Sequence, residues 1–261
     1  MRRSNKRAAD PLASSDVHEL PAGPPLSLER IGRVTELLRP FVLPERLERL
    51  RDVVSSRTRH LTLLLEEVHD AHNIAACIRT CEAFGLQELH LIPCTEKPLK
   101  MSRLVASGAD RWLKVHVHED VAAAEHALKG SGYRIAVTDP REGPDLHTPS
   151  DISIASPLCI AFGNEKEGVS DALIAAADLR LHIPMSGFVE SLNIPVAVAI
   201  SVARIRERLE QSPESRWKLT AEQQAALLDR WILEDVPHAH SILEEIAKRQ
   251  QSALNPEDGS V

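Results

Sequence analysis

Two polar side chains in the stretch HNIAACIRT, residues 72–80, could take part in chemistry. Asn73 stands where a helix would begin, so it is either the N-cap of that helix or a hydrogen-bonding group of a site. Arg79 follows among apolar residues, where a guanidinium is unfavourable unless it meets an anion, reaches water or pairs with a carboxylate such as Glu66 or Glu82. The residues alone leave these interpretations open.

A second polar stretch, FGNEKEGVS at residues 162–170, places Glu165 and Lys166 between two glycines. Glycine lets the backbone turn sharply and approach a ligand closely, because it has no Cβ. An ordinary turn between a strand and a helix would explain the same glycines. Glu165 is therefore a candidate site residue with a structural alternative beside it.

The third stretch, IPMSGFVESLN at residues 183–193, is a loop with prolines and glycine that runs directly into an apolar helix. Loops usually lie in water, because buried backbone groups need partners. This loop carries Ile183, Met185, Phe188 and Val189, whose side chains prefer to be covered. The loop alone does not show what covers them.

Several common catalytic motifs are absent from the sequence. It contains no glycine fingerprint of dinucleotide-binding folds, no phosphate-binding P-loop and no G-x-S-x-G of hydrolases. Cys77 and Cys81 share a helix face near His72, but further ligands of a zinc site do not follow at suitable spacing. We therefore predict no metal site, and we expect His116 and His118 to be ordinary surface residues of one strand.

From residue 61 onward, short apolar runs alternate with helical patterns. This alternation indicates the fold that positions the three stretches. Such alternation is typical of βαβ units and predicts an α/β domain at 61–210, with a mostly parallel sheet and helices on both faces. The expected strands cover 61–67, 86–92, 111–117, 133–139, 157–163 and 179–184, and the expected helices cover 73–85, 119–132, 170–178 and 193–210. Ligands gather at the carboxyl ends of such strands, where all three stretches fall.

Helical segments flank this domain. A tail at 1–25 precedes two amphipathic helices within 26–60, the first with Ser27 as its N-cap, and two more helices fall within 211–251 before a tail at 252–261. The first 60 residues carry a net charge of about +4 and the remainder about −11, within a total of −7. The basic segment is either an RNA-binding arm or a solvated helix face. The candidate contacts are Arg46, Arg49, Arg51, Arg57 and Arg59.

Composition limits the remaining choices. The 261 residues are 43% hydrophobic but only 3% aromatic, which argues against recognition by rows of base-stacking rings. Four scattered cysteines, the lack of a signal peptide and the lack of any apolar run near 18 residues predict a soluble protein of the cytoplasm.

Together the three stretches carry a resemblance that none carries alone. In this order, NIAACIRTCEAFG, IAFGNEKEGVSDALIAAAD and IPMSGFVESLNIPVAVAISVARIRER resemble the signature motifs of the SPOUT methyltransferases, and within them the TrmH family of tRNA (guanosine-2'-O)-methyltransferases. The resemblance covers about residues 28–250. It implies a SPOUT fold with a C-terminal trefoil knot, S-adenosyl-L-methionine as cofactor and a homodimer.

The resemblance also implies roles for single residues. The catalytic positions fall on Arg79, Asn73, Glu165, Ser191 and Asn193, and the cofactor contacts fall on Thr138, Gly163, Ile183 and Leu192. The implied reaction methylates the ribose 2'-hydroxyl of a guanosine in tRNA, at position 18 of the D-loop. Arg79 would act either as the base or as a cation that orients a phosphate and stabilises the forming alkoxide.

Two alternatives stay open beside this function. One is a 2'-O-methyltransferase for rRNA, although such relatives usually carry a globular N-terminal domain where this chain has short helices. The other is a non-catalytic RNA-binding protein, against which the joint presence of the five catalytic residue types argues. Glu190 replaces the glutamine usual before SLN, which puts substrate choice in doubt. With RNA as substrate, the basic segment is more readily an RNA-binding arm, and we expect neither a membrane nor DNA as partner.

Overall fold

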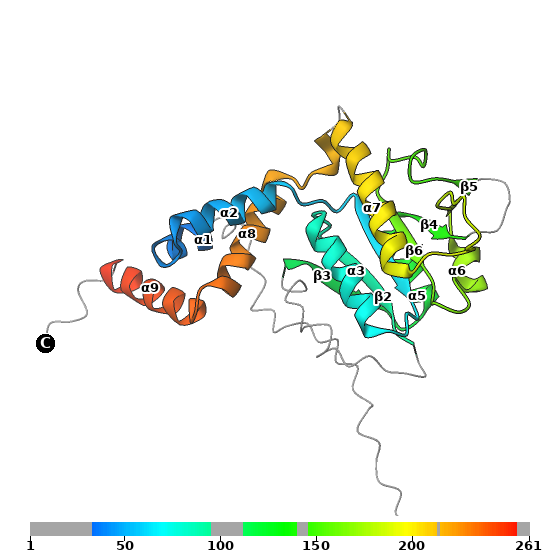
Figure 1. The fold of residues 1–261 in the computed structure, drawn as a ribbon. Coiled ribbons are helices and arrows are strands. Elements are labelled where there is room, and N and C mark those ends of the chain that lie inside the picture. The colour runs from blue at the N-terminus through cyan, green and yellow to red at the C-terminus, as the bar shows by residue number, and fades with distance from the viewer. Residues whose placement is uncertain (1–32, 95–111, 140–145, 213–214, 255–261) are drawn as a thin grey trace, which may run out of the picture.

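The computed structural model describes residues 33–94, 112–139, 146–212 and 215–254. Within these residues the chain forms a layered α/β domain and, beside it, a helical unit built from N- and C-terminal helices (Figure 1). The predicted tail at 1–25, the Ser27 N-cap and most of the tail at 252–261 lie outside the described residues.

A sheet of seven strands forms the centre of the α/β domain, in the order β3-β2-β1-β6-β4-β7-β5. Each neighbouring pair in this sheet is parallel. The strands are β1 (Leu61–Glu66), β2 (Glu88–Ile92), β3 (Lys114–Val117), β4 (Arg134–Thr138), β5 (Leu146–His147), β6 (Leu158–Phe162) and β7 (Leu179–Leu181). All six predicted strands are present, and the short β5 was not predicted.

Helices cover both faces of this sheet. They are α3 (Ala71–Ala83), α5 (Val121–Gly130), α6 (Asp171–Ala176) and α7 (Ile194–Gln211). α3 and α7 pack against one face, and α5 and α6 against the other (Figure 1). Alternation within β1 explains the two cores: Leu63 and Leu65 join the core under α3 and α7, whereas Leu64 joins the core under α5 and α6. The predicted fold class is therefore confirmed.

The position of β6 is the unusual feature of this sheet. β6 follows both β1 and β4 in the chain, yet it lies between them. Ile160 of β6 is the register partner of Leu63 on one side and of Ala136 on the other. A late strand is thus inserted between two earlier ones. The trefoil knot that the resemblance implies stays a prediction.

The helical unit combines both flanking segments. It consists of α1 (Arg33–Leu38), η2 (Arg39–Phe41), α2 (Pro44–Ser55), η4 (Ser215–Trp217), α8 (Ala221–Asp235) and α9 (Ala239–Leu254). Buried side chains of α1, α2, α8 and α9 form a hydrophobic cluster of their own, which includes the fully buried Trp231. The two segments that we predicted as separate extensions lie together because each has an apolar helix face to cover.

Two buried arginines join the helical unit to the α/β domain. Arg57 pairs with Glu82 of α3 at 3.0 Å, and its guanidinium carbon lies 5.1 Å from the centroid of the Trp231 ring. The guanidinium carbon of Arg206, on α7, lies 4.0 Å from the centroid of the Trp217 ring. Cation–π contacts of this kind strengthen where water is excluded. They hold the helical unit against α3 and α7.

Candidate functional site

The turn at residues 163–168, here called the glycine turn, follows β6 and is held by its own backbone. The amide of Asn164 donates to the carbonyl of Gly168 at 3.0 Å, and the amide of Gly168 donates to the carbonyl of Asn164 at 3.2 Å. Gly168 has a φ of +73°, and a Cβ on Gly163 would lie 1.9 Å from the backbone of Gly168. Both glycines are therefore needed by the turn itself, which carries Glu165.

Glu165 connects the glycine turn to the start of α3. Its Oε1 accepts a hydrogen bond from Nδ2 of Asn73 at 2.7 Å, and its Oε2 accepts from the backbone amide of His69 at 3.3 Å. Burial alone would raise the pKa of Glu165, but these bonds and the backbone amide of Asp70 lower the pKa below its usual value. The carboxylate is therefore ionised at neutral pH and acts as an acceptor.

Asp70 caps α3, and Asn73 does not. The Asp70 backbone is extended, and its side chain accepts from the amide of His72 at 2.8 Å. Asn73 thus lies in the first turn of α3, where its side chain reaches Glu165. The capping interpretation of Asn73 is wrong, because Asp70 already serves as the cap. Asp70 and His69 were not predicted as site residues, although the Asp before the helix was a readable capping signal.

Arg79 is exposed on α3 and forms no hydrogen bond or ion pair with a described residue. The two carboxylates considered as its partners are engaged elsewhere. Glu66 accepts from the amide and the hydroxyl of Ser170, and Glu82 pairs with Arg57. Within the described residues, the guanidinium of Arg79 is therefore available to an external anion.

Arg79 does not join the pair formed by Asn73 and Glu165. At 100° per residue, six residues bring Arg79 about 120° around α3 from Asn73 and about 9 Å further along the axis. The structure therefore brings Asn73 and Glu165 into contact, whereas Arg79 lies on another side of α3.

The loop at residues 183–193, here called the apolar loop, is exposed and weakly bonded. Met185, Phe188 and Val189 are 38%, 108% and 64% exposed. No amide of the loop donates a backbone hydrogen bond to a described residue. The apolar loop thus presents both apolar side chains and unused backbone groups to its surroundings.

Ser191 and Asn193 lie at the end of the apolar loop, where α7 begins. Both side chains are exposed, and neither hydrogen-bonds to a described residue. The carbonyl of Asn193 accepts from the amides of Val196 and Ala197 at 3.0 Å each, so its backbone starts the helix while its amide side chain is not used as a cap. Both polar side chains are available to a ligand.

The residues predicted to contact the cofactor lie at neighbouring strand ends. Thr138 ends β4, Gly163 follows β6 and Ile183 lies shortly after β7, and these three strands are adjacent in the sheet. The Thr138 hydroxyl donates to the Ala161 carbonyl at 3.0 Å, which ties β4 to β6. Ile183 and Leu192, at the two ends of the apolar loop, are partly buried. This edge combines apolar walls with free backbone groups, as sites for flat heteroaromatic ligands do.

Arg57 is not available as an RNA contact in this structure. Its side chain is fully buried and donates to the Leu86 carbonyl at 3.1 Å, besides its ion pair with Glu82. Burial also lowers the pKa of Arg57, partly offset by Glu82. Its prediction as a phosphate contact is wrong for this conformation, because the guanidinium joins two parts of the protein instead.

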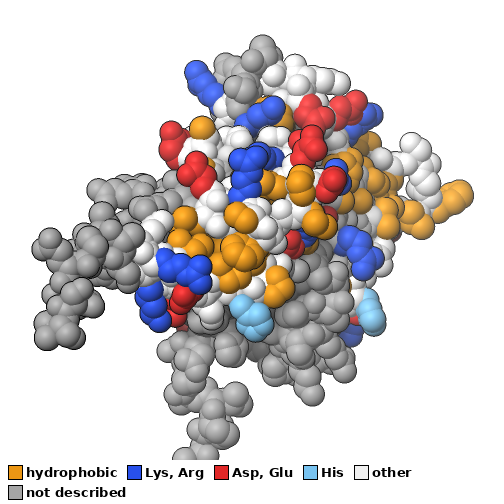
Figure 2. Space-filling model, turned by 90° about the vertical axis from the view of Figure 1, so that its left-hand side faces the viewer, with side chains coloured by type: hydrophobic (Ala, Val, Ile, Leu, Met, Phe, Trp, Pro, Cys, Tyr) orange, Lys and Arg blue, Asp and Glu red, His pale blue; other side chains and the backbone are white. Residues whose placement is uncertain are grey.

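The other four predicted RNA contacts are at least partly exposed, but they differ in their partners. Arg46 donates to both carboxylate oxygens of Asp235, at 3.1 and 2.7 Å, and Arg59 is also in an ion pair. Arg49 and Arg51 on α2 form no ion pair with a described residue. On the face in Figure 2, basic side chains are interspersed with acidic and hydrophobic ones.

His116 and His118 are not ordinary surface residues. Their rings stack on His90, with centroid distances of 4.6 and 5.2 Å. His90 is only 5% exposed. The sequence-based expectation was wrong because it did not include the neighbouring strand that covers these rings.

Comparison with known proteins identifies the family of this chain. Residues 60–203 match the SpoU rRNA Methylase family, over more than half of the chain. The chain belongs to this family. Within it, the tRNA (guanosine(18)-2'-O)-methyltransferase of Thermus thermophilus is 35% identical over 188 residues, which cover 72% of this chain and 95% of that protein. The enzyme of the same name from Escherichia coli K12 is 31% identical over 212 residues, covering 79% and 87%.

An rRNA methyltransferase is matched over less of its own length, whereas a solved tRNA modifying enzyme is matched almost completely. The 23S rRNA (guanosine-2'-O-)-methyltransferase RlmB of Nitrosomonas europaea is 33% identical over 172 residues, which cover 65% of this chain and 62% of that protein. The crystal structure of the Aquifex aeolicus TrmH/SpoU tRNA modifying enzyme superimposes with a TM-score of 0.63 at 27% identity, covering 74% of this chain and 98% of that one. The family resemblance is thereby confirmed. No helix in the described ranges is long and apolar enough to span a membrane.

Proposed function

We propose that this protein is an S-adenosyl-L-methionine-dependent methyltransferase that modifies the ribose 2'-hydroxyl of guanosine 18 in tRNA. The observation that carries the proposal is similarity along almost the whole length of tRNA (guanosine(18)-2'-O)-methyltransferases, together with the contact between Asn73 and Glu165. A protein that had lost catalysis would have no reason to keep this polar pair exposed at the edge where parallel sheets bind ligands.

The rRNA alternative has less support from chain length. The rRNA relative extends well beyond the part that matches this chain, whereas the tRNA relatives are matched almost completely. The helical unit of this chain is short, and it leaves no room for a large separate RNA-binding domain within the described residues. We therefore favour tRNA over rRNA as the substrate.

The cofactor fits the edge between the glycine turn and the apolar loop. Adenine offers flat apolar faces and a hydrogen-bonding rim, which suit the side chains of Ile183 and Leu192 and the free backbone groups beside them. Thr138 and Gly163 stand at the adjacent strand ends. When bound, S-adenosyl-L-methionine supplies a methyl group that its sulfonium already activates. The protein's task is then to orient the ribose and to accommodate a proton.

Arg79 is assigned to the RNA side of the reaction. Its guanidinium is exposed and unpaired among the described residues, so it can meet a phosphate of the substrate. Because arginine side chains hardly lose a proton in proteins, we favour an orienting and charge-stabilising role over that of a true base. Positive charge beside the 2'-oxygen would stabilise the alkoxide as it forms.

Asn73, Glu165, Ser191 and Asn193 are assigned to the polar wall of the same site. Glu165 holds the Asn73 amide by its nitrogen, which turns the amide oxygen of Asn73 away from the glycine turn and makes it available as an acceptor. Ser191 and Asn193 carry unbonded polar groups on the opposite loop. We propose that these groups position the guanosine and its ribose.

The helical unit is assigned to tRNA binding. Arg49 and Arg51 have no ion-pair partner among the described residues, whereas Arg46 and Arg59 would have to share their guanidinium groups with carboxylates. This assignment covers the segments at 26–60 and 211–251, with the domain at 61–210 performing the chemistry. With tRNA as its substrate, we propose that the protein acts in the cytoplasm.

A homodimer accounts for the exposed apolar surface of α7 and the apolar loop. Phe188, Val189, Val196 and Ile200 are all at least 40% exposed. Val196 and Ile200 are four residues apart on α7 and therefore share one face. We propose that a second copy of the chain covers this surface.

The experiment that tests this function is methyl transfer with labelled cofactor. The full chain is incubated with tritiated S-adenosyl-L-methionine and unmodified bulk tRNA or rRNA, and the labelled nucleoside is mapped. We expect label in tRNA as 2'-O-methylguanosine at position 18, no label with Arg79→Ala and full label with Lys129→Ala, an exposed cationic residue of α5. Label only in rRNA would support the alternative enzyme, and label in neither RNA would support the non-catalytic protein.

A further inference from the structure

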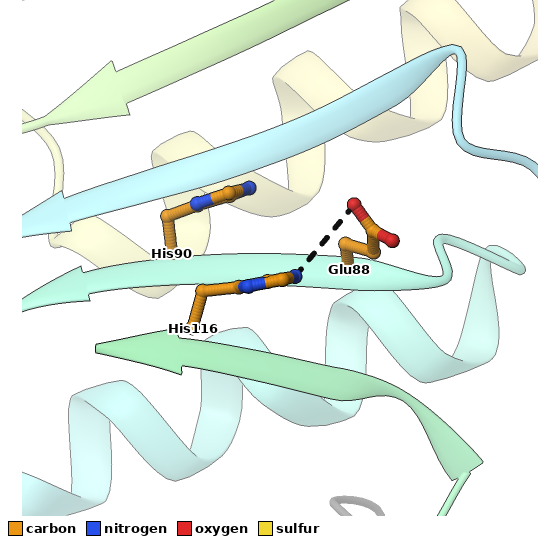
Figure 3. A group of neighbouring side chains, drawn as sticks. All are labelled: Glu88, His90 and His116. Carbon is orange, nitrogen blue, oxygen red and sulfur yellow. Dashed lines mark ion pairs between the residues drawn. The ribbon is translucent and has the colours of Figure 1, made fainter. Parts of the chain in front are cut away.

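Three side chains on β2 and β3 bring metal-ligand atoms together away from the proposed methyl-transfer site. Glu88 and His90 lie on β2, and His116 lies on β3 as the register partner of His90. One ligand atom of each side chain lies within 4.8 Å of those of the other two. Figure 3 shows the two rings side by side, with their outer nitrogens toward the Glu88 carboxylate. The cluster therefore has the composition of a three-ligand metal site.

The cluster faces the α5 side of the sheet. Leu89 and Leu91, which flank His90 on β2, belong to the core under α3 and α7, so His90 projects to the opposite face. There its ring meets Tyr133 edge to face, with a centroid distance of 6.5 Å. Asn73, at the start of α3, belongs to the other layer of the domain. A ligand of this cluster would therefore be separate from the proposed methyl-transfer site.

Two nitrogens of the cluster are buried without a hydrogen bond, although Nε2 of His116 lies 3.7 Å from Oε2 of Glu88. Nε2 of His90 and Nε2 of His116 form no hydrogen bond with the described residues. His90 is 5% exposed, so water has little access to its ring. Buried polar atoms are normally hydrogen-bonded, and two nitrogens that face one carboxylate without a hydrogen bond indicate a missing ligand.

Neighbouring groups orient the two histidine nitrogens and the Glu88 carboxylate for binding a metal ion. Nδ1 of His90 lies 2.9 Å from Nε2 of His118, and the two nitrogens share one proton. With that proton on Nδ1 of His90, its Nε2 carries a lone pair, which is the arrangement of metal-binding histidines. Arg59 holds Oε1 of Glu88 at 2.9 Å, while Oε2 faces Nε2 of His116 at 3.7 Å.

We propose that Glu88, His90 and His116 form a binding site for Zn²⁺, with a fourth coordination position left for water. Two imidazoles and one carboxylate suit zinc, whereas Mg²⁺ and Ca²⁺ prefer oxygen ligands only. The rings are nearly parallel in this structure, with centroids 4.6 Å apart, so zinc binding requires them to tilt toward each other until both nitrogens reach the usual Zn–N distance of about 2.0–2.1 Å. The ion would cross-link the edge strand β3 to β2.

Sequence spacing did not reveal this site because its ligands come from two strands. The absence of a metal site was inferred from Cys77, Cys81 and His72, whose neighbours lack the short ligand spacings of zinc motifs. The new ligands meet only through the parallel register of β2 and β3. The positive charges of Arg59 and Lys114 oppose a cation, so we expect a dissociation constant on the order of micromolar rather than nanomolar.

Zinc titration of the untagged full chain tests the proposal. The protein is stripped with a chelator and titrated with ZnCl₂ in competition with a chromophoric chelator. We expect one Zn²⁺ per chain with a dissociation constant on the order of micromolar, at least about tenfold weaker binding in His116→Ala and Glu88→Gln, and unchanged binding in His240→Ala, an exposed histidine of α9. Zinc should raise the thermal midpoint of the wild type and of His240→Ala, but not that of His116→Ala.

Two results would overturn the proposal. One is the absence of stoichiometric Zn²⁺ binding by the wild type, and the other is wild-type affinity in both His116→Ala and Glu88→Gln. Circular dichroism of each variant separates lost binding from lost folding, and Glu88→Gln carries the test if His116→Ala does not fold. Because the readout is metal binding, its outcome is independent of methyl-transfer activity.

Discussion

Two loops at the same edge of the sheet differ in how they are held. The glycine turn closes on itself through two backbone hydrogen bonds and fixes Glu165 against the start of α3. The apolar loop, two strands away in the sheet, makes no such bonds to described residues and exposes Phe188 and Val189. This difference supports our proposal of a site with a preformed polar half and a second half that a ligand and a partner subunit complete.

We expect the largest effect from a substitution that distorts the glycine turn, which is the preformed half of the site. In Gly163→Ala the new Cβ would lie 1.9 Å from the backbone of Gly168, so the glycine turn must shift and Glu165 with it. We expect a loss of stability of about 1–3 kcal/mol and nearly complete loss of methyl transfer. Thermal unfolding and initial rates measure these effects.

Gly187→Ala is the matched control in the apolar loop, since an added Cβ there meets nothing within 4 Å. Its stability should stay within about 0.5 kcal/mol of the wild type. If both variants behaved alike, the two loops would not differ in rigidity as described.

Asn73→Asp is expected to have the next largest effect. It replaces the donor to Glu165 by a second carboxylate, so like charges meet at the hydrogen-bond distance of 2.7 Å. We expect methyl transfer to fall by about 100-fold, the scale of a misplaced catalytic group, while the unfolding midpoint at neutral pH changes much less. Unchanged rates in Asn73→Asp would show that this contact is not part of the site.

The pH dependence of stability is an independent test of the contact between Asn73 and Glu165. Because the folded-state pKa of Glu165 lies below its ordinary value of 4.5, the contact stabilises the fold above that value. This stabilisation is lost as the pH falls through the lower, folded-state pKa. Asn73→Ala should therefore lose less stability than the wild type on acidification from neutral pH. Parallel acid unfolding curves would contradict the assignment.

Phe188→Asp tests the half that a partner subunit completes. A charge on this fully exposed side chain should be unfavourable in a subunit interface, so we expect the dimer dissociation constant to rise at least about tenfold, equivalent to about 1.4 kcal/mol. Light scattering after size exclusion measures the mass. Leu43→Asp, at an exposed apolar residue of the helical unit, should leave the mass unchanged. A wild-type chain that is monomeric would remove the basis of this prediction.

The smallest expected effect is on tRNA affinity, outside both loops. Replacing Arg49 and Arg51 by alanine should weaken tRNA binding several-fold and lower the slope of log affinity against log salt by roughly 1–2, because each lost phosphate contact releases about one counterion less. Lys129→Ala on α5 serves as the control. An unchanged slope would mark the α2 arginines as a solvated helix face.

How much of this could be predicted from the sequence depends on whether a feature is local. Strands and helices followed from alternating apolar runs, and the site residues followed from a family resemblance in three short motifs. The burial of Arg57 could not be foreseen, because its partners Glu82 and Trp231 come from distant parts of the chain. The same holds for the stack on His90, which depends on strand register. Features that depend on contacts between distant parts of the chain cannot be predicted from local sequence patterns.

Amide hydrogen exchange on the full chain tests the two-loop account most directly. It is measured with and without S-adenosyl-L-homocysteine, the unreactive product of the cofactor. The account predicts slow exchange of the Asn164 and Gly168 amides in both states, and fast exchange at residues 183–193 that slows on binding. Equally fast exchange of both loops in the free protein, or no protection of residues 183–193 on binding, would contradict it.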